Sequence, residues 1–184
     1  MKKLVTLAAA VTMLFGAMSA QAAGDPTMGG LGFHSTVAPI GIREWFSDKL
    51  GFDLGVGFSS DGFKNKTPNA PTFKNASTYF VDLGMPWIAK KWDKVNFIVR
   101  PGFQYGSLKD DDAVIGNTKK ANQWSVSGDF EVEVMLADKF SVSAAHGIAF
   151  TQLTDKSGAN DRVFTNFSST GENFTSLGFH VYLW

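Results

Sequence analysis

The sequence contains no cysteine among its 184 residues. This excludes disulfide bonds, and it excludes a lipid anchor on a cysteine at a processed N-terminus. Basic and acidic residues balance at 17 each, and the basic residues form no patch or stripe of the kind that binds nucleic acid. No segment after the first 22 residues is apolar enough for a transmembrane helix. Nucleic acid is therefore not expected as a partner.

The first 22 residues have the pattern of an export signal. Lys2 and Lys3 give a positive start, residues 4–16 form an apolar run, and small residues precede a cleavage position after Ala22. Cleavage one residue later, after Ala23, fits almost as well. The apolar run is shorter than the roughly 20 residues that a membrane-spanning helix needs. We therefore expect residues 1–22 to be a cleaved signal peptide and residues 23–184 to form one domain.

Glycine and phenylalanine are abundant, at 19 and 17 residues, which suits a curved, aromatic-rich sheet better than a helical bundle. Residues 124–136 also indicate a sheet, because apolar residues at even positions alternate with polar residues at odd positions. Side chains alternate across a strand, so this pattern predicts a strand with one apolar and one acidic face. Strands of soluble proteins average about 5–6 residues, whereas membrane-spanning strands need about 9–11.

The same alternation predicts eight strands, at residues 29–35, 40–46, 52–58, 79–87, 95–105, 124–136, 140–150 and 177–183. Short turns at residues 47–50, 90–94 and 137–139 alternate with long polar connections at residues 61–77, 108–122 and 153–173. Short turns on one side and long loops on the other are typical of outer-membrane barrels. The prediction is all-β, an eight-stranded antiparallel up-and-down transmembrane β-barrel with both termini on the periplasmic side.

Aromatic residues fall into two bands on this map, as bilayer interfaces favour. The alternative is a soluble sandwich or lipocalin-like barrel with its apolar face inward. It explains neither the aromatic bands nor the sorted loop lengths. The predicted interface aromatics are Trp45, Trp87, Trp92 and Trp184 at the short-turn end, and Tyr79, Tyr105 and Trp124 at the long-loop end.

Residues 40–58, IGIREWFSDKLGFDLGVGF, carry a family resemblance. They resemble the hairpin of small bacterial outer-membrane β-barrel domain proteins, a group that includes the OmpX/OmpA-like and OmpW-like eight-stranded barrels. The resemblance implies a meander barrel in the outer membrane of a Gram-negative cell envelope. It implies no particular activity, because the group is functionally mixed.

The last strand departs from the pattern of this family. In this family the last strand usually ends in an aromatic residue and carries apolar residues at every second position before it, on the same face. This pattern is the signal for barrel assembly. Trp184 and Tyr182 follow that rule, but His180 does not, and the apolar residues stand on the opposite parity. A β-bulge near the end would reconcile the two patterns.

The polar parity of the strands predicts a charged interior. Eight strands leave a lumen just wide enough for side chains to fill, so buried carboxylates need the two arginines as partners. We expect a polar plug that blocks flow. A narrow porin-like channel is the alternative, since the excess of acids would favour cations. The predicted interior network comprises Arg43, Asp53, Asp82, Arg100, Asp129, Glu131, Glu133 and His180.

No set of residues supports catalysis. His34 and Ser35 are adjacent and would point to opposite faces of a strand, His146 falls on the apolar face, and His180 lies four residues from Ser176. Residues 110–112 are acidic but lack the alternate-ligand spacing of calcium loops, so they are interpreted as a solvated charge run. We expect no enzyme activity, cofactor or metal.

The expected role is a structural one or an interaction at the cell surface, with the barrel as a stable scaffold for three long extracellular loops. The expected partners are outer-membrane lipid and lipopolysaccharide, whose phosphates basic loop residues could meet, and the barrel-assembly machinery during insertion. The loops could also bind an extracellular ligand. The basic loop residues are Lys64, Lys66, Lys74, Lys119, Lys120 and Arg162.

Overall fold

The computed structural model describes residues 28–33, 37–61, 76–112, 117–156, 160–169 and 175–183. The expected signal peptide, His34 and Trp184 lie outside these ranges. No helix among the described residues is long and apolar enough to cross a membrane. The ordered elements are ten strands: β1 Gly29–Phe33, β2 Ile40–Trp45, β3 Gly51–Asp61, β4 Ala76–Gly84, β5 Trp87–Trp92, β6 Val95–Asp112, β7 Asn117–Ala137, β8 Phe140–Asp155, β9 Arg162–Ser168 and β10 Thr175–Tyr182.

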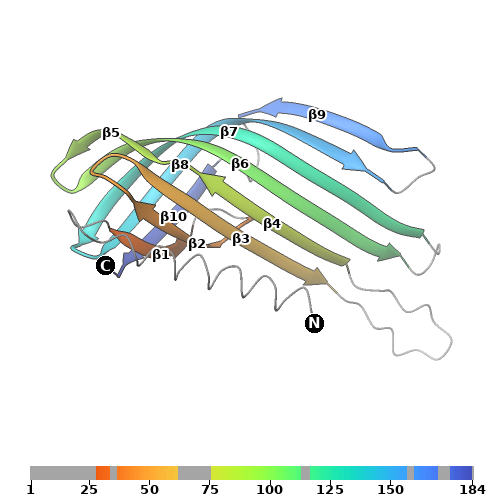
Figure 1. Ribbon diagram of the computed structural model, residues 1–184, viewed down its shortest axis with the longest axis horizontal. Helices are drawn as coiled ribbons and strands as arrows, with labels where there is room; N and C mark the ends of the chain where they lie inside the picture. The colour runs from red at the N-terminus through yellow and green to blue at the C-terminus, as the bar shows by residue number, and fades with distance from the viewer. Residues whose placement is uncertain are drawn as a thin grey trace.

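These ten segments make eight positions in one closed antiparallel wall (Figure 1). β4 and β5 both pair with β6, one after the other along its length, and β9 and β10 share β8 in the same way. β10 also pairs with β1, which closes the sheet on itself. The prediction of an all-β, eight-stranded, up-and-down antiparallel barrel is confirmed.

Two prolines mark the break between β4 and β5. Pro86 lies in the gap between the two strands, and Pro101 lies opposite on β6, where Met85 N–H donates to its carbonyl oxygen at 3.0 Å. Proline has no N–H to give to a ladder, so it is tolerated where pairing is already interrupted. β6 keeps a continuous register with β7 through Pro101. The register shift in this hairpin lies between Ile88 and Lys90 instead.

The strands extend further toward the loop side than the sequence pattern predicts. β6 runs to Asp112 and β7 begins at Asn117, so the acidic residues 110–112 stand in a strand rather than in the predicted long loop. β9 likewise lies within the predicted loop 153–173. The added ends of β6 and β7 are mostly polar on both faces, and β9 has apolar residues on both faces, so no alternation of apolar and polar residues marks these segments. Backbone pairing with the neighbouring strand is enough to make them strands.

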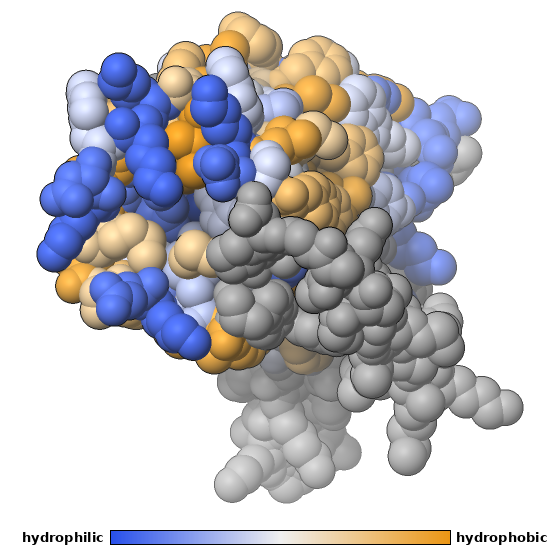
Figure 2. Space-filling view, turned by 60° about the vertical axis from the view of Figure 1, so that its left-hand side comes forward, coloured by the Kyte–Doolittle hydropathy of each residue, from blue (hydrophilic) through white to orange (hydrophobic). Residues whose placement is uncertain are grey.

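The distribution of side chains is inverted relative to an ordinary globular core. Among the described residues, eleven buried residues are polar or charged and seven are hydrophobic, while 26 large hydrophobic residues are exposed. Figure 2 shows apolar residues on the barrel wall between hydrophilic residues at its two ends. The apolar parity therefore faces outward and the polar parity faces the lumen.

The last strand needs no bulge. β10 pairs with β8 in one continuous register from Thr175 to Val181, so the expected bulge is wrong for the described residues. Leu177, Phe179 and Val181 are exposed, and His180 and Tyr182 are buried. The outer face of this strand therefore carries Leu177, Phe179 and Val181. Tyr182 points inward because its hydroxyl group has partners in the lumen.

Candidate functional site in the barrel interior

The interior charges come from six strands that surround one lumen. Arg43 on β2 stands directly opposite Asp53 on β3, and Arg100 on β6 stands opposite Asp129 on β7. Directly opposite residues share a face of the sheet, so the registers alone set these groups side by side. The structure also brings in Asp82 from β4, Glu131 and Glu133 from β7, and His180 from β10.

Arg43 spans the lumen. Its Nε and Nη2 donate to Asp53 Oδ1 and Oδ2 at 2.8 and 2.9 Å. Its Nη1 and Nη2 donate to Glu131 Oε1 and Oε2, both at 2.8 Å. The guanidinium group is therefore held by two bidentate pairs, with four hydrogen bonds in all. One fully buried side chain thereby ties β2 and β3 to β7 across the barrel.

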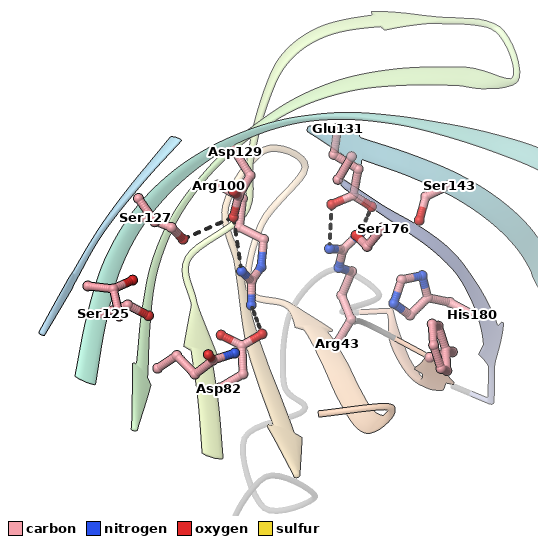
Figure 3. Close-up of a pocket in the computed structure, with 15 residues that line it drawn as sticks. Arg43, Asp82, Arg100, Ser125, Ser127, Asp129, Glu131, Ser143, Ser176 and His180 are labelled. Carbon is pink, nitrogen blue, oxygen red and sulfur yellow. Dashed lines mark hydrogen bonds and ion pairs between the residues drawn. The ribbon is translucent and has the colours of Figure 1, made fainter. Parts of the chain in front are cut away.

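Arg100 makes a second bridge that shares Asp53 with the first. Its Nε donates to Asp53 Oδ2 at 2.7 Å, and its Nη2 donates to Asp82 Oδ2 at 3.0 Å. Its Nη1 reaches Asp129 Oδ2 at 3.4 Å. Figure 3 shows Arg100 between Asp129 and Asp82, with Arg43 directed at Glu131. Asp53 has no exposed surface and joins the two arginines into one network.

Two glycines make room for this network. A Cβ on Gly84 would meet the guanidinium group of Arg100, and a Cβ on Gly147 would meet the Asp129 carboxylate. A Cβ on Gly128 would meet nothing within 4 Å. Glycine at positions 84 and 147 is therefore required by close approach to charged side chains.

A second layer surrounds Glu133 on the short-turn side. Glu133 accepts from Ser141 Oγ at 2.8 Å, from Tyr182 OH at 2.7 Å and from Asn96 Nδ2 at 3.0 Å. His180 Nδ1 lies 3.7 Å from Glu133 Oε1. Sequence reasoning missed the polar partners Ser141 and Asn96, although both stand on the inward parity. Serine and asparagine are short and neutral, so they mark the inward face of a strand less clearly than charged residues do.

Trp45 is the one predicted interface aromatic that the structure places inside. It is 7% exposed, packs with Ile88, Ile98 and Tyr182, and donates from Nε1 to Tyr182 OH at 3.3 Å. The prediction of an interface position for Trp45 is wrong, because its parity is that of Arg43, which lies 5.7 Å from its ring. Its indole N–H finds its partner in the lumen.

The other predicted aromatics in the described residues lie on the outer wall. Trp87, Trp92, Tyr79 and Tyr105 are exposed, and Trp124 is half-buried against Phe150, with 5.6 Å between ring centroids. Phe58 and Tyr79 pack in the same way at 5.2 Å. At the opposite end, Trp92 packs edge-on against Phe97 at 4.9 Å. Aromatic pairs therefore stand on the outside near both ends of the strands.

The network separates two hollows. The hollow on the loop side has a volume of about 50 Å³ and is lined by Arg43, Arg100 and Glu131 together with small polar residues such as Ser125. The hollow at the short-turn end has a volume of about 480 Å³, with Trp45 and Tyr182 in its lining. None of the described residues lines both hollows, and the charged layer lies between them.

No group of three or more His, Asp or Glu residues among the described residues is arranged to hold a metal ion. His146 is exposed on the outer face, as its parity predicts, with no serine or carboxylate beside it on its own strand face. Asp53 and Glu131 are paired with arginine, and Glu133 accepts hydrogen bonds from Ser141, Tyr182 and Asn96.

No protein-family model matches the chain, and no curated protein sequence matches it. The structure shows a small eight-stranded antiparallel β-barrel, and these comparisons identify no family for it.

Proposed function

We propose that the protein is an outer-membrane β-barrel with a plugged lumen and a structural or surface-interaction role. In this proposal the chain is exported by its signal peptide, inserted by the barrel-assembly machinery and oriented with both termini in the periplasm. Its partners are membrane lipid and lipopolysaccharide, with any further ligand bound at the loop end. The protein is not an enzyme in this proposal.

The outer wall supports a membrane location. Exposed apolar residues cover all eight wall positions, from Leu31 on β1 to Val181 on β10, and aromatic pairs flank them. In water such a surface would be unfavourable by about 25 cal/mol for each Å² of apolar area. A bilayer removes that cost, and a closed barrel leaves no backbone edge in the hydrocarbon.

The charged layer supports the plug, and it is the observation that carries the proposal. Arg43 joins opposite walls through bidentate pairs, and none of the described residues lines the hollows on both sides of the layer. A continuous water path would need these contacts to open. Removing one partner of such a buried pair typically costs about 3–5 kcal/mol, so spontaneous opening is rare.

Planar-bilayer recording of the purified protein tests the plug. We expect no steady conductance from the wild-type protein and transient currents from Arg100→Gln. Asp138→Asn, which changes an exposed turn beside the short-turn hollow, is the control and should remain silent. Steady wild-type channels that Glu131→Gln abolishes would overturn the plug in favour of a pore.

A narrow cation channel is the second candidate, and the charge balance of the layer favours it. Five carboxylates face two guanidinium groups in the lumen. An acidic constriction selects for cations when it conducts. Reversal potentials in a salt gradient separate the candidates, because a pore would show cation selectivity in the wild type and a plug would show none.

A further inference from the structure

The hollow at the short-turn end is much the larger of the two hollows. Its volume is about 480 Å³, against about 50 Å³ on the loop side. Sites for small molecules have volumes of about 300–1,000 Å³, whereas the smaller hollow has room for a few water molecules. The mouth of the larger hollow is formed by residues of the three short turns, at the left-hand end of Figure 1. This hollow therefore has the size of a small-molecule site.

The floor of the short-turn hollow is apolar. It consists of a hydrophobic cluster in the barrel interior, of which every member except Ile98 lines the hollow. Met28 and Met135 are half-buried, so they offer the more accessible part of this surface. Apolar surface in an open hollow gains free energy when an apolar group covers it, so the floor selects for a ligand with an apolar body. The cluster comprises Trp45, Ile88, Ile98 and Tyr182, with Met28 and Met135 packed against them.

The polar groups at the floor are already engaged. Glu133, which also lines the hollow, accepts hydrogen bonds from Ser141, Tyr182 and Asn96. A charged group of a ligand would lose its hydration at this depth without gaining a carboxylate that lacks partners. The charged groups of a ligand therefore belong at the mouth, with its apolar body on the floor.

The mouth carries charges of both signs on two adjacent segments. Asp48 lies in the turn between β2 and β3, and Lys91 lies near the end of β5. Ile88 N–H donates to the carbonyl oxygen of Lys49 at 2.7 Å, which sets the turn and β5 side by side. Lys91 stands directly opposite Asn96, which is buried and lines the same hollow. A carboxylate and an ammonium group thus border the hollow from neighbouring segments.

Neither of these two charges is used within the described part of the chain. The Asp48 carboxylate and the Lys91 ammonium group form no hydrogen bond or ion pair with each other or with any other described residue. Both side chains are exposed, and hydrophilic residues gather at this end of the barrel (Figure 2). Both charges are therefore available to a ligand. The other charged residues at the mouth are Asp93, Lys94 and Asp138.

We propose that the short-turn hollow binds a zwitterion with an apolar body, which is the chemistry of an apolar α-amino acid. Its ammonium group lies at Asp48, its carboxylate lies at Lys91, and its body lies on Met28 and Met135 above Trp45. A ligand with one charge would leave the opposite charge of the mouth unmatched. The hollow opens to the periplasm in the orientation proposed above, so the source of the ligand rests on the proposed function, whereas binding itself does not.

Methyl NMR of the whole protein in lipid nanodiscs, labelled at the methionine methyl groups, locates the ligand. Met28 and Met135 line the hollow, whereas Met85 is 53% exposed on the outer wall and serves as an internal control. L-Phenylalanine is the probe, because its ring shifts the signals of methyl groups that it contacts. We expect saturable shifts at Met28 and Met135 and none at Met85. Equal shifts at all three positions, or none at Met28 and Met135, would overturn the site.

Three further probes test the chemistry of the site. Glycine lacks the apolar body, 2-phenylethylamine lacks the carboxylate, and 3-phenylpropionate lacks the ammonium group. We expect the two single-charge probes to bind about threefold more weakly than L-phenylalanine, as exposed ion pairs allow. Glycine should bind more than about tenfold more weakly, because it leaves the floor uncovered. If any of the three binds as tightly as L-phenylalanine, the zwitterion with an apolar body is the wrong ligand class.

Lys91→Gln and Lys90→Gln form a matched pair on β5. Both lysines are exposed, but Lys91 lines the hollow and Lys90 stands opposite Phe97, which is exposed on the outer wall. We expect Lys91→Gln to weaken the binding of L-phenylalanine about threefold and to leave that of 2-phenylethylamine unchanged. Lys90→Gln should change neither. Equal effects of the two variants on L-phenylalanine would contradict the role of Lys91.

Asp48→Asn tests the other charge of the pair. We expect it to weaken the binding of L-phenylalanine about threefold and to leave that of 3-phenylpropionate unchanged. Asp161→Asn, which changes an exposed carboxylate outside the hollow, is the control and should have no effect. A loss that is the same for both probes would show that Asp48 does not contact the ammonium group.

Bilayer recording and gel mobility before and after heating separate this inference from the proposed function. A heat-modifiable, non-conducting barrel whose Met28 and Met135 signals do not respond would disprove the amino-acid site and leave the plugged barrel standing. Steady wild-type channels together with saturable shifts at Met28 and Met135 would overturn the plug and support the site.

Discussion

The short-turn half and the loop half of the barrel are built from the same strands but are held in different ways. In the short-turn half, Arg43, Glu131 and Glu133 are buried and fully engaged by neighbouring strands. In the loop half, inward residues such as Phe164 and Asn166 are exposed, and β9 pairs with one of the described strands, β8. The comparison shows that buried ion pairs join the strands in one half, whereas the other half has fewer buried contacts and is expected to open at a lower free-energy cost.

The largest expected effect is the loss of the central guanidinium. Arg43→Gln leaves the Asp53 and Glu131 carboxylates buried without their bidentate partner. We expect a loss of about 3–5 kcal/mol in the free energy of unfolding, measured by urea titration of the barrel refolded in detergent micelles. A loss below about 1 kcal/mol would show that the short-turn half does not depend on this layer.

Two glycine substitutions test the packing around that layer. Gly84→Ala places a methyl group against the Arg100 guanidinium, whereas Gly128→Ala meets nothing within 4 Å. We expect the first to destabilise the barrel by about 1–3 kcal/mol and the second to change stability by less than about 0.5 kcal/mol. Matching midpoints for the two variants in urea would contradict the close approach at Gly84.

The hydroxyl group of Tyr182 tests the second layer. Tyr182→Phe removes the donor to Glu133 and the acceptor for Trp45 Nε1. We expect a cost of about 1–3 kcal/mol, because Glu133 is then under-satisfied in a buried site. Tyr79→Phe, on the exposed wall, is the control and should leave the unfolding midpoint unchanged.

The smallest effect is expected in the loop half. Arg162→Gln changes an exposed charge on β9, and exposed ion pairs contribute about 0–1 kcal/mol. Comparing the loss in the free energy of unfolding with that of Arg43→Gln measures how much more the short-turn half contributes to stability than the loop half. If both arginine variants lose the same stability, the division of labour between the halves is wrong.

The alternation of residues in the chain predicted most of this architecture. Period two in residues 124–136 places Asp129, Glu131 and Glu133 on one face, and the structure has that face inside. The positions of the short turns could be predicted because short polar segments interrupt the alternation between strands. The extension of β6 and β7 and the presence of β9 could not be predicted in this way, because those segments show no alternation of apolar and polar residues and pair through their backbones.

The sequence by itself determined which face of each strand is polar and how many strands the wall holds, because a strand's two faces are read directly from alternate residues. Only the tertiary structure decided which charges meet. Arg43 and Glu131 stand 88 residues apart, and their pairing depends on barrel closure and register. It also decided that the wall differs between its ends, because that depends on how far β1, β2 and β10 extend along the barrel.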